Sequence, residues 1–129
     1  MGKIIILMGK TASGKNFIRN KLIEEFGYKP VVTYTTRPPR PGEVDGVDYH
    51  FISEEKFMIM IRDGEFVEYK SYAVKDHNAD CVWFYGSPNI DISDNDDHVI
   101  ILTPKGTRQY MDKYGNDICK CFLISSNDS

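Results

Sequence analysis

The sequence lacks an excess of basic charge and a long apolar run. Its 129 residues include 16 basic and 19 acidic side chains, which gives a formal net charge of −3. General nucleic-acid binding usually needs a basic face, so the composition argues against it, although a local basic cluster can still bind one phosphate ligand. No apolar run reaches the roughly 18 residues that a membrane-spanning helix requires. We therefore expect neither a nucleic-acid partner nor a membrane span.

Cysteine is scarce, and its spacing excludes the usual redox and zinc motifs. Cys81, Cys119 and Cys121 are odd in number and lack CxxC spacing, so we expect reduced thiols. Cys119 and Cys121 could form half of a metal site, but alternation along a strand is the favoured interpretation. The apolar run at residues 4–8 is too short for a signal peptide, and no small-residue cleavage site follows it. The expected location is the cytoplasm.

Aliphatic runs and helical periodicity alternate along the chain. Residues 3–8, 98–103 and 117–124 are runs of strand length, which suit strands buried on both faces of a parallel sheet. Residues 15–26 carry apolar side chains at helical spacing, and Gly27 is a suitable stop. A second helix is predicted over residues 104–114, beginning near Pro104. This order is typical of α/β proteins with a three-layer core.

The middle of the chain predicts a smaller lobe. Ser53 is a suitable N-cap for a helix that ends before Gly64. Residues 89–97 contain four aspartates but lack the glycine that a calcium loop needs, so we expect a surface loop there. The predicted strands of the lobe are residues 31–35, 49–51, 65–74 and 81–85.

A glycine-rich turn between the first strand and the first helix fits the phosphate-binding pattern G-x-x-x-x-G-K. Backbone N–H groups of such a turn wrap a phosphate, and the positive end of the following helix faces the anion. Lys15 would neutralise β- and γ-phosphate oxygens. The alternative is an ordinary glycine turn with a surface lysine. The candidate ATP-binding residues are Gly9, Lys10, Thr11, Ala12, Ser13, Gly14, Lys15 and Asn16.

Asn16 departs from the usual form of this motif. A serine or threonine normally follows the lysine and supplies a hydroxyl to magnesium. An asparagine offers a carbonyl oxygen, which can also ligate a hard cation. We therefore predict Asn16 as a weak ligand of Mg²⁺ that arrives with ATP.

The segment Thr33 to Phe51, which contains TTRPPRPGEVDGVDYHF, closely resembles the GMP-binding segment of guanylate kinases. The resemblance continues through residues 64–69 and 85–87. It implies a phosphate-binding core at residues 1–32 and 89–129, with a parallel sheet, and a mixed or antiparallel GMP-binding lobe at residues 33–88. By resemblance, the phosphate of GMP is held by Arg37, Arg40, Tyr49 and Tyr85, and the base by Thr33, Glu68 and Ser87.

These residue types also suit those ligands chemically. Two guanidiniums on a proline-stiffened loop match a phosphate with little entropy left to lose. Guanine presents N1–H and N2–H₂ as adjacent donors, and one carboxylate accepts both, so Glu68 as base reader predicts guanine over adenine. The simpler alternatives are a solvated loop for the arginines and a surface strand position for Glu68.

The resemblance implies transfer of the ATP γ-phosphate to GMP or dGMP. Lys15, Arg37 and Arg40 would catalyse by neutralising and aligning the phosphates. No general base is needed, because the acceptor phosphate is already an oxyanion. The expected partners are therefore ATP, Mg²⁺ and GMP or dGMP, and the sequence leaves protein partners unknown.

The sequence also departs from the family pattern. Ile101 and Thr103 stand where carboxylates are expected, residues 75–80 look like an insertion with His77 at the surface, and no arginine-rich lid follows residue 124. A second hypothesis is therefore a guanylate kinase-like binding module or fragment with little turnover. A third is a different phosphate-loop kinase with another small acceptor.

Overall fold

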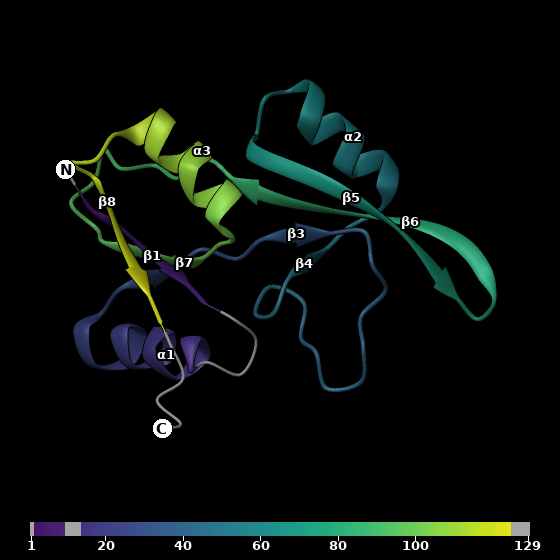
Figure 1. Ribbon diagram of the computed structural model, residues 1–129, viewed down its shortest axis with the longest axis horizontal. Helices are drawn as coiled ribbons and strands as arrows, with labels where there is room; N and C mark the ends of the chain where they lie inside the picture. Colours follow the sequence, from purple (N-terminus) through teal and green to yellow (C-terminus); the bar gives the residue numbers. More distant parts are fainter. Residues whose placement is uncertain (1, 10–13, 125–129) are drawn as a thin grey trace. The chain divides into compact units, whose positions relative to one another are not determined.

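In the computed structural model the described residues are 2–9 and 14–124. The chain folds as two compact units (Figure 1). Unit 1 comprises Met1–Val31 and Ile90–Ser129, and unit 2 comprises Val32–Asn89.

Unit 1 contains a four-stranded parallel sheet in the order β2-β7-β1-β8. Its strands are β1 (Ile4–Met8), β2 (Lys29–Pro30), β7 (His98–Ile101) and β8 (Cys119–Leu123). Ile4, Ile6 and Val99 of the two central strands have no exposed surface. Helices cover both faces of a parallel sheet, so its central strands become continuously apolar. This confirms the predicted α/β class with a parallel sheet.

The helices α1 (Lys15–Phe26) and α3 (Pro104–Tyr114) lie on opposite faces of this sheet (Figure 1). Thr103 caps α3, because its hydroxyl accepts a hydrogen bond from the Gly106 N–H at 3.2 Å. Helix α3 buries Tyr110 completely. Helix α1 buries none of its side chains, and Phe17 and Phe26 stay 66% and 67% exposed. The span of α1 matches the prediction, but its apolar side chains are more exposed than the helical periodicity implies.

Unit 2 contains a mixed sheet in the order β4-β3-β6-β5, in which β3 and β4 are parallel and the other pairs antiparallel. The strands are β3 (Tyr34–Thr35), β4 (His50–Phe51), β5 (Phe66–Asp76) and β6 (Ala79–Pro88). Helix α2 (Glu54–Arg62) begins at Ser53, whose hydroxyl accepts from the Lys56 N–H at 3.1 Å. Its buried Phe57 packs against Phe66 and Phe84, with ring centroids 4.7 and 5.4 Å apart. This aromatic cluster is the core of the unit.

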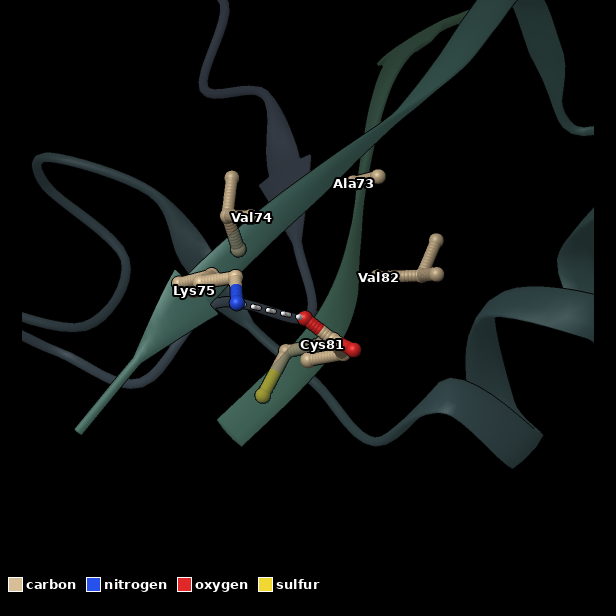
Figure 2. Close-up of a pocket in the computed structure, with 6 residues that line it drawn as sticks. Ala73, Val74, Lys75, Cys81 and Val82 are labelled. Atoms are coloured by element: carbon tan, nitrogen blue, oxygen red, sulfur yellow. Dashed lines mark ion pairs between the residues drawn. The ribbon is translucent and has the colours of Figure 1, made fainter. Parts of the chain in front are cut away.

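The predicted insertion at residues 75–80 is the end of one long hairpin. Strands β5 and β6 continue past the predicted limits, and the turn is His77–Asn78, with φ of 52° and 66°. Positive φ at both turn residues matches the twist of a tight hairpin. The Lys75 amine lies 3.7 Å from a carboxylate oxygen of Asp80 across this end of the hairpin, and the dashed line from Lys75 in Figure 2 marks this ion pair. The predicted strands end at residue 74 and begin again at residue 81, but cross-strand pairing continues through Lys75–Asp80 and Asp76–Ala79.

The predicted strand over residues 31–35 was also wrong in extent. Only Tyr34–Thr35 forms a strand of unit 2, whereas Lys29–Pro30 forms an edge strand of unit 1. Proline lacks an N–H and is therefore found mainly at sheet edges. The β-branched residues between the two strands connect the two units.

Two further predictions concern the cysteines and His77. The three cysteines are free thiols, and the His77 side chain is 96% exposed. Burial raises the pKa of the Cys119 thiol to about 11, which keeps it protonated at neutral pH. Across residues 2–9 and 14–124, no helix combines the length and apolarity needed to cross a bilayer, and no three His, Cys, Asp or Glu side chains converge as a metal site.

Candidate functional site

In unit 1 the described residues of the predicted glycine-rich turn are Gly9, after β1, and Gly14 to Asn16, at the start of α1. Gly14 caps the helix with φ 93°, a left-handed conformation that side-chain-bearing residues rarely adopt. The Lys15 amine donates to the Gly9 carbonyl at 2.6 Å, which joins the start of α1 to the residue that follows β1. No acidic side chain lies in the first turn of α1. The described part of the turn therefore offers a cation and a helix N-terminus without a competing carboxylate.

Lys10, Thr11, Ala12 and Ser13 were predicted for this site but lie outside the described residues. Asn16 is exposed at the start of α1. Ile101 is half-buried in β7, and the Thr103 hydroxyl is engaged in capping α3. No carboxylate therefore stands at either position where the resemblance expects one.

In unit 2 a β-bulge sets the direction of Glu68. Phe66 pairs with Pro88 and Glu68 with Ser87, so Val67 is an extra residue in β5. Regular alternation would place Phe66 and Glu68 on the same face. The bulge instead leaves Phe66 in the aromatic core and turns Glu68 to the opposite face, beside Ser87. Bulges commonly redirect a side chain in this way next to functional sites.

Glu68 and Ser87 form a buried polar pair. They are 9% and 5% exposed, and the Ser87 hydroxyl donates to a Glu68 carboxylate oxygen at 3.1 Å. A carboxylate can accept about four hydrogen bonds, so the one from Ser87 leaves capacity for further donors. This pair suits a ligand that presents two adjacent N–H groups.

Arg37 is held by a residue that the sequence reasoning did not assign to the site. Its guanidinium donates two hydrogen bonds to the Glu43 carboxylate, each 2.9 Å long, and is only 4% exposed. Its Cζ also lies 5.3 Å from the Tyr49 ring centroid. The Arg40 backbone N–H donates to Glu43 as well, at 2.7 Å. Glu43 therefore closes the proline-rich loop that carries Arg37 and Arg40. In the sequence, the only signal for this role is an acidic residue six positions after Arg37.

This pairing shifts both ionisations. The hydrogen bonds from Arg37, with a smaller contribution from the Arg40 N–H, lower the pKa of Glu43 from 4.5 to about 2. Glu43, with a smaller contribution from Tyr85, raises the pKa of Arg37. Both groups are therefore charged at neutral pH. A carboxylate whose pKa is lower in the folded state stabilises the fold fully above pH 4.5 and loses that contribution as the pH falls toward 2.

We expect Glu43→Gln to lower the thermal unfolding midpoint at pH 7, because a buried guanidinium loses its charged partner. The difference from wild type should shrink as the pH falls from about 4.5 toward 2, where wild-type Glu43 itself becomes protonated. Thermal melts over pH 2 to 7 measure both effects. Glu65→Gln, at an exposed position of the same unit, is the control. A pH-independent difference would contradict this account of the loop.

The remaining predicted residues for GMP also belong to unit 2. The Tyr85 ring lies 6.0 Å from that of Tyr49, and Tyr85 projects from the same face of β6 as Ser87. The Arg40 side chain is exposed, and no carboxylate in the described chain forms an ion pair with it. Thr33 is half-buried beside β3, with its carbonyl accepting from the His50 N–H at 2.8 Å. Unit 2 thus brings Arg37, Tyr49 and Tyr85 together, and separately Glu68 and Ser87.

Comparison with known proteins gives a consistent family. The family model described as "Guanylate kinase" matches residues 1–78. A guanylate kinase of Rhodopseudomonas palustris (strain HaA2) is 34% identical over 128 residues, which cover 95% of this chain and 54% of that protein. A guanylate kinase of Enterococcus faecalis (strain V583) is 35% identical over 118 residues, covering 87% and 54%. The chain thus spans about half the length of these relatives.

The fold is similar to that of a solved structure. The crystal structure of guanylate kinase from Anaplasma phagocytophilum matches with a TM-score of 0.65 at 22% identity, over 95% of this chain and 58% of that one. At this identity the match supports the fold alone. The family model, by contrast, covers residues 1–78, which include both the glycine-rich motif and the proline-rich loop. The match ends at the turn of the long hairpin, His77–Asn78.

Proposed function

The chain belongs to the guanylate kinase family, and we propose that it binds ATP and GMP or dGMP and transfers the γ-phosphate to form ADP and GDP or dGDP. The buried Glu68–Ser87 pair is the observation on which this proposal chiefly depends. Removing a carboxylate from water is costly unless a ligand or neighbour compensates it. Guanine supplies the two donors that this carboxylate can still accept.

The base preference follows from this hydrogen-bonding pattern. Guanine N1–H and N2–H₂ would both donate to the Glu68 carboxylate, whose orientation the Ser87 hydroxyl maintains. Adenine would place its N1 lone pair against the same carboxylate. A site that leaves buried polar groups unpaired with the wrong ligand discriminates strongly. Thr33 is proposed as an additional contact to the base.

The phosphate of GMP is proposed to bind at the proline-rich loop, which carries Arg37 and Arg40, and at Tyr49 and Tyr85. The Arg40 guanidinium is available for a direct contact. Arg37 supports the loop through Glu43 and the Pro38 carbonyl and contacts the phosphate through N–H groups that these three bonds do not use. The Tyr49 and Tyr85 hydroxyls would complete the site. Stabilisation of phosphate charge is the main catalytic requirement in phosphoryl transfer.

The donor nucleotide is proposed to bind at the glycine-rich turn, residues 9–16. Lys15 would exchange its bond to the Gly9 carbonyl for the β- and γ-phosphate oxygens. Mg²⁺ usually enters such sites bound to nucleotide phosphates and water, with few protein ligands. Asn16 is the candidate protein ligand of Mg²⁺, and neither Ile101 nor Thr103 offers a carboxylate to the metal.

A coupled assay of ADP release with ATP, Mg²⁺ and GMP tests this function, with AMP and UMP as alternative acceptors. Turnover with GMP and dGMP alone supports the proposal. GMP binding by calorimetry without turnover would instead support the second candidate function, a nucleotide-binding module. The lack of carboxylates at positions 101 and 103 is the observation that favours this candidate. Preferential turnover of AMP or UMP would contradict the assignment of Glu68.

A further inference from the structure

Lys70 projects from the same face as the proposed GMP-binding residues. It lies two residues after Glu68 on β5 and directly opposite Tyr85 on β6. Pairing between β5 and β6 is regular from Glu68 onward, so the side chains of Lys70, Tyr85, Glu68 and Ser87 share one face. Directly opposed residues on one face have Cβ atoms about 4.5 to 5.5 Å apart. The four-carbon stem of Lys70 thus begins beside a proposed phosphate ligand.

Among residues 2–9 and 14–124, no carboxylate lies within the 4.0 Å of an ion pair from the Lys70 amine. Its Nζ lies 5.9 Å from the centre of the Tyr72 ring, and the side chain is half-buried. The Tyr72 ring in turn lies 5.8 Å from the Tyr85 ring. A cation–π contact at a partly exposed position is weak, so the amine can exchange it for a stronger, anionic partner.

The residues proposed to bind the phosphate of GMP carry less positive charge than the phosphate carries negative charge. A phosphate monoester carries nearly two negative charges at neutral pH. The Arg37 charge is cancelled by Glu43, whose carboxylate it holds through two hydrogen bonds. Of the predicted phosphate ligands, this leaves only Arg40 as an uncompensated cation. Lys70 supplies the second positive charge that matches the dianion.

We propose that Lys70 contacts the phosphate of the bound nucleoside monophosphate and is a determinant of acceptor affinity in this chain. The inference rests on the proposed function, because it assumes that GMP lies on this face of unit 2. Lysine suits the role, since its ammonium has three rotatable donors on a flexible stem. From its position opposite Tyr85, that stem turns from the Tyr72 ring toward the phosphate.

Calorimetric titration of Lys70→Gln with GMP and with guanosine, which lacks the phosphate, tests this proposal. We expect the Kd for GMP to rise about tenfold, as for loss of one hydrogen bond to a charged group, and the Kd for guanosine to stay unchanged. Lys70→Arg should retain most of the affinity. The matched control is Lys75→Gln, because Lys75 lies on the same strand, projects from the opposite face and pairs with Asp80.

Two results would overturn the assignment of Lys70 alone: unchanged GMP affinity in Lys70→Gln, or an equal loss of affinity for GMP and guanosine. The second result would indicate a structural role. A wild-type chain that binds neither ligand would overturn the proposed function and this inference together. Raising the salt concentration gives an independent measurement, because GMP binding should weaken less steeply in Lys70→Gln than in wild type.

Discussion

Glu68→Gln is expected to reduce affinity for GMP by about 100-fold and to abolish the preference for guanine over adenine. The substitution keeps the shape of the side chain but replaces one acceptor oxygen with an NH₂ donor. That donor would face the N1–H or N2–H₂ of guanine, so a charged hydrogen-bond pair is replaced by one neutral bond and one repulsive contact. Loss of hydrogen bonds to a charged group and an unpaired buried donor together account for a change of this size.

The fold should survive this change, because the remaining amide oxygen can still accept from the Ser87 hydroxyl. Calorimetry with GMP and AMP, together with thermal melts, separates recognition from stability. Ser87→Ala should produce a smaller loss, because it removes only the group that orients the carboxylate. If Glu68→Gln bound GMP as tightly as wild type, the base would have to be recognised elsewhere.

Lys15→Met is expected to reduce phosphoryl transfer by about 100- to 1000-fold, which is the range seen when one preorganised donor to a developing negative charge is removed. Affinity for ATP should fall as well, whereas affinity for GMP should remain close to wild type. The residues proposed for GMP all belong to unit 2, and Lys15 belongs to unit 1.

Lys21→Met is the matched control for this experiment. Lys21 lies on the same helix, is 53% exposed and pairs with Glu25, so its loss should change neither activity nor nucleotide binding. ATP binding provides a second readout that does not depend on turnover. Loss of GMP binding in Lys15→Met to the same extent as ATP binding would indicate a general structural defect, and the assigned role of Lys15 would then be wrong.

Local signals in the sequence were sufficient where the structure depends on neighbouring residues. Helix α1 covers residues 15–26, as its periodicity and Gly27 predicted. Ser53 caps α2 as expected, because capping depends on a hydroxyl and an N–H three residues away. The alternating α/β order of unit 1 likewise followed from short aliphatic runs separated by helices.

Tertiary pairing decided the features that matter most for the candidate site. The bulge at Val67, which sets the direction of Glu68, depends on the register between β5 and β6. The bidentate bond between Arg37 and Glu43 depends on the path of the proline-rich loop. The position of Lys70 opposite Tyr85 depends on the same long hairpin, whose turn carries no glycine.

The sequence by itself therefore determined which chemical groups this protein offers and the secondary structure around most of them. The tertiary structure alone decided which of the charges are cancelled and which remain available to a ligand. The physical reason is that periodicity and capping involve residues a few positions apart, whereas strand register and ion pairing join residues that only the folded backbone brings together.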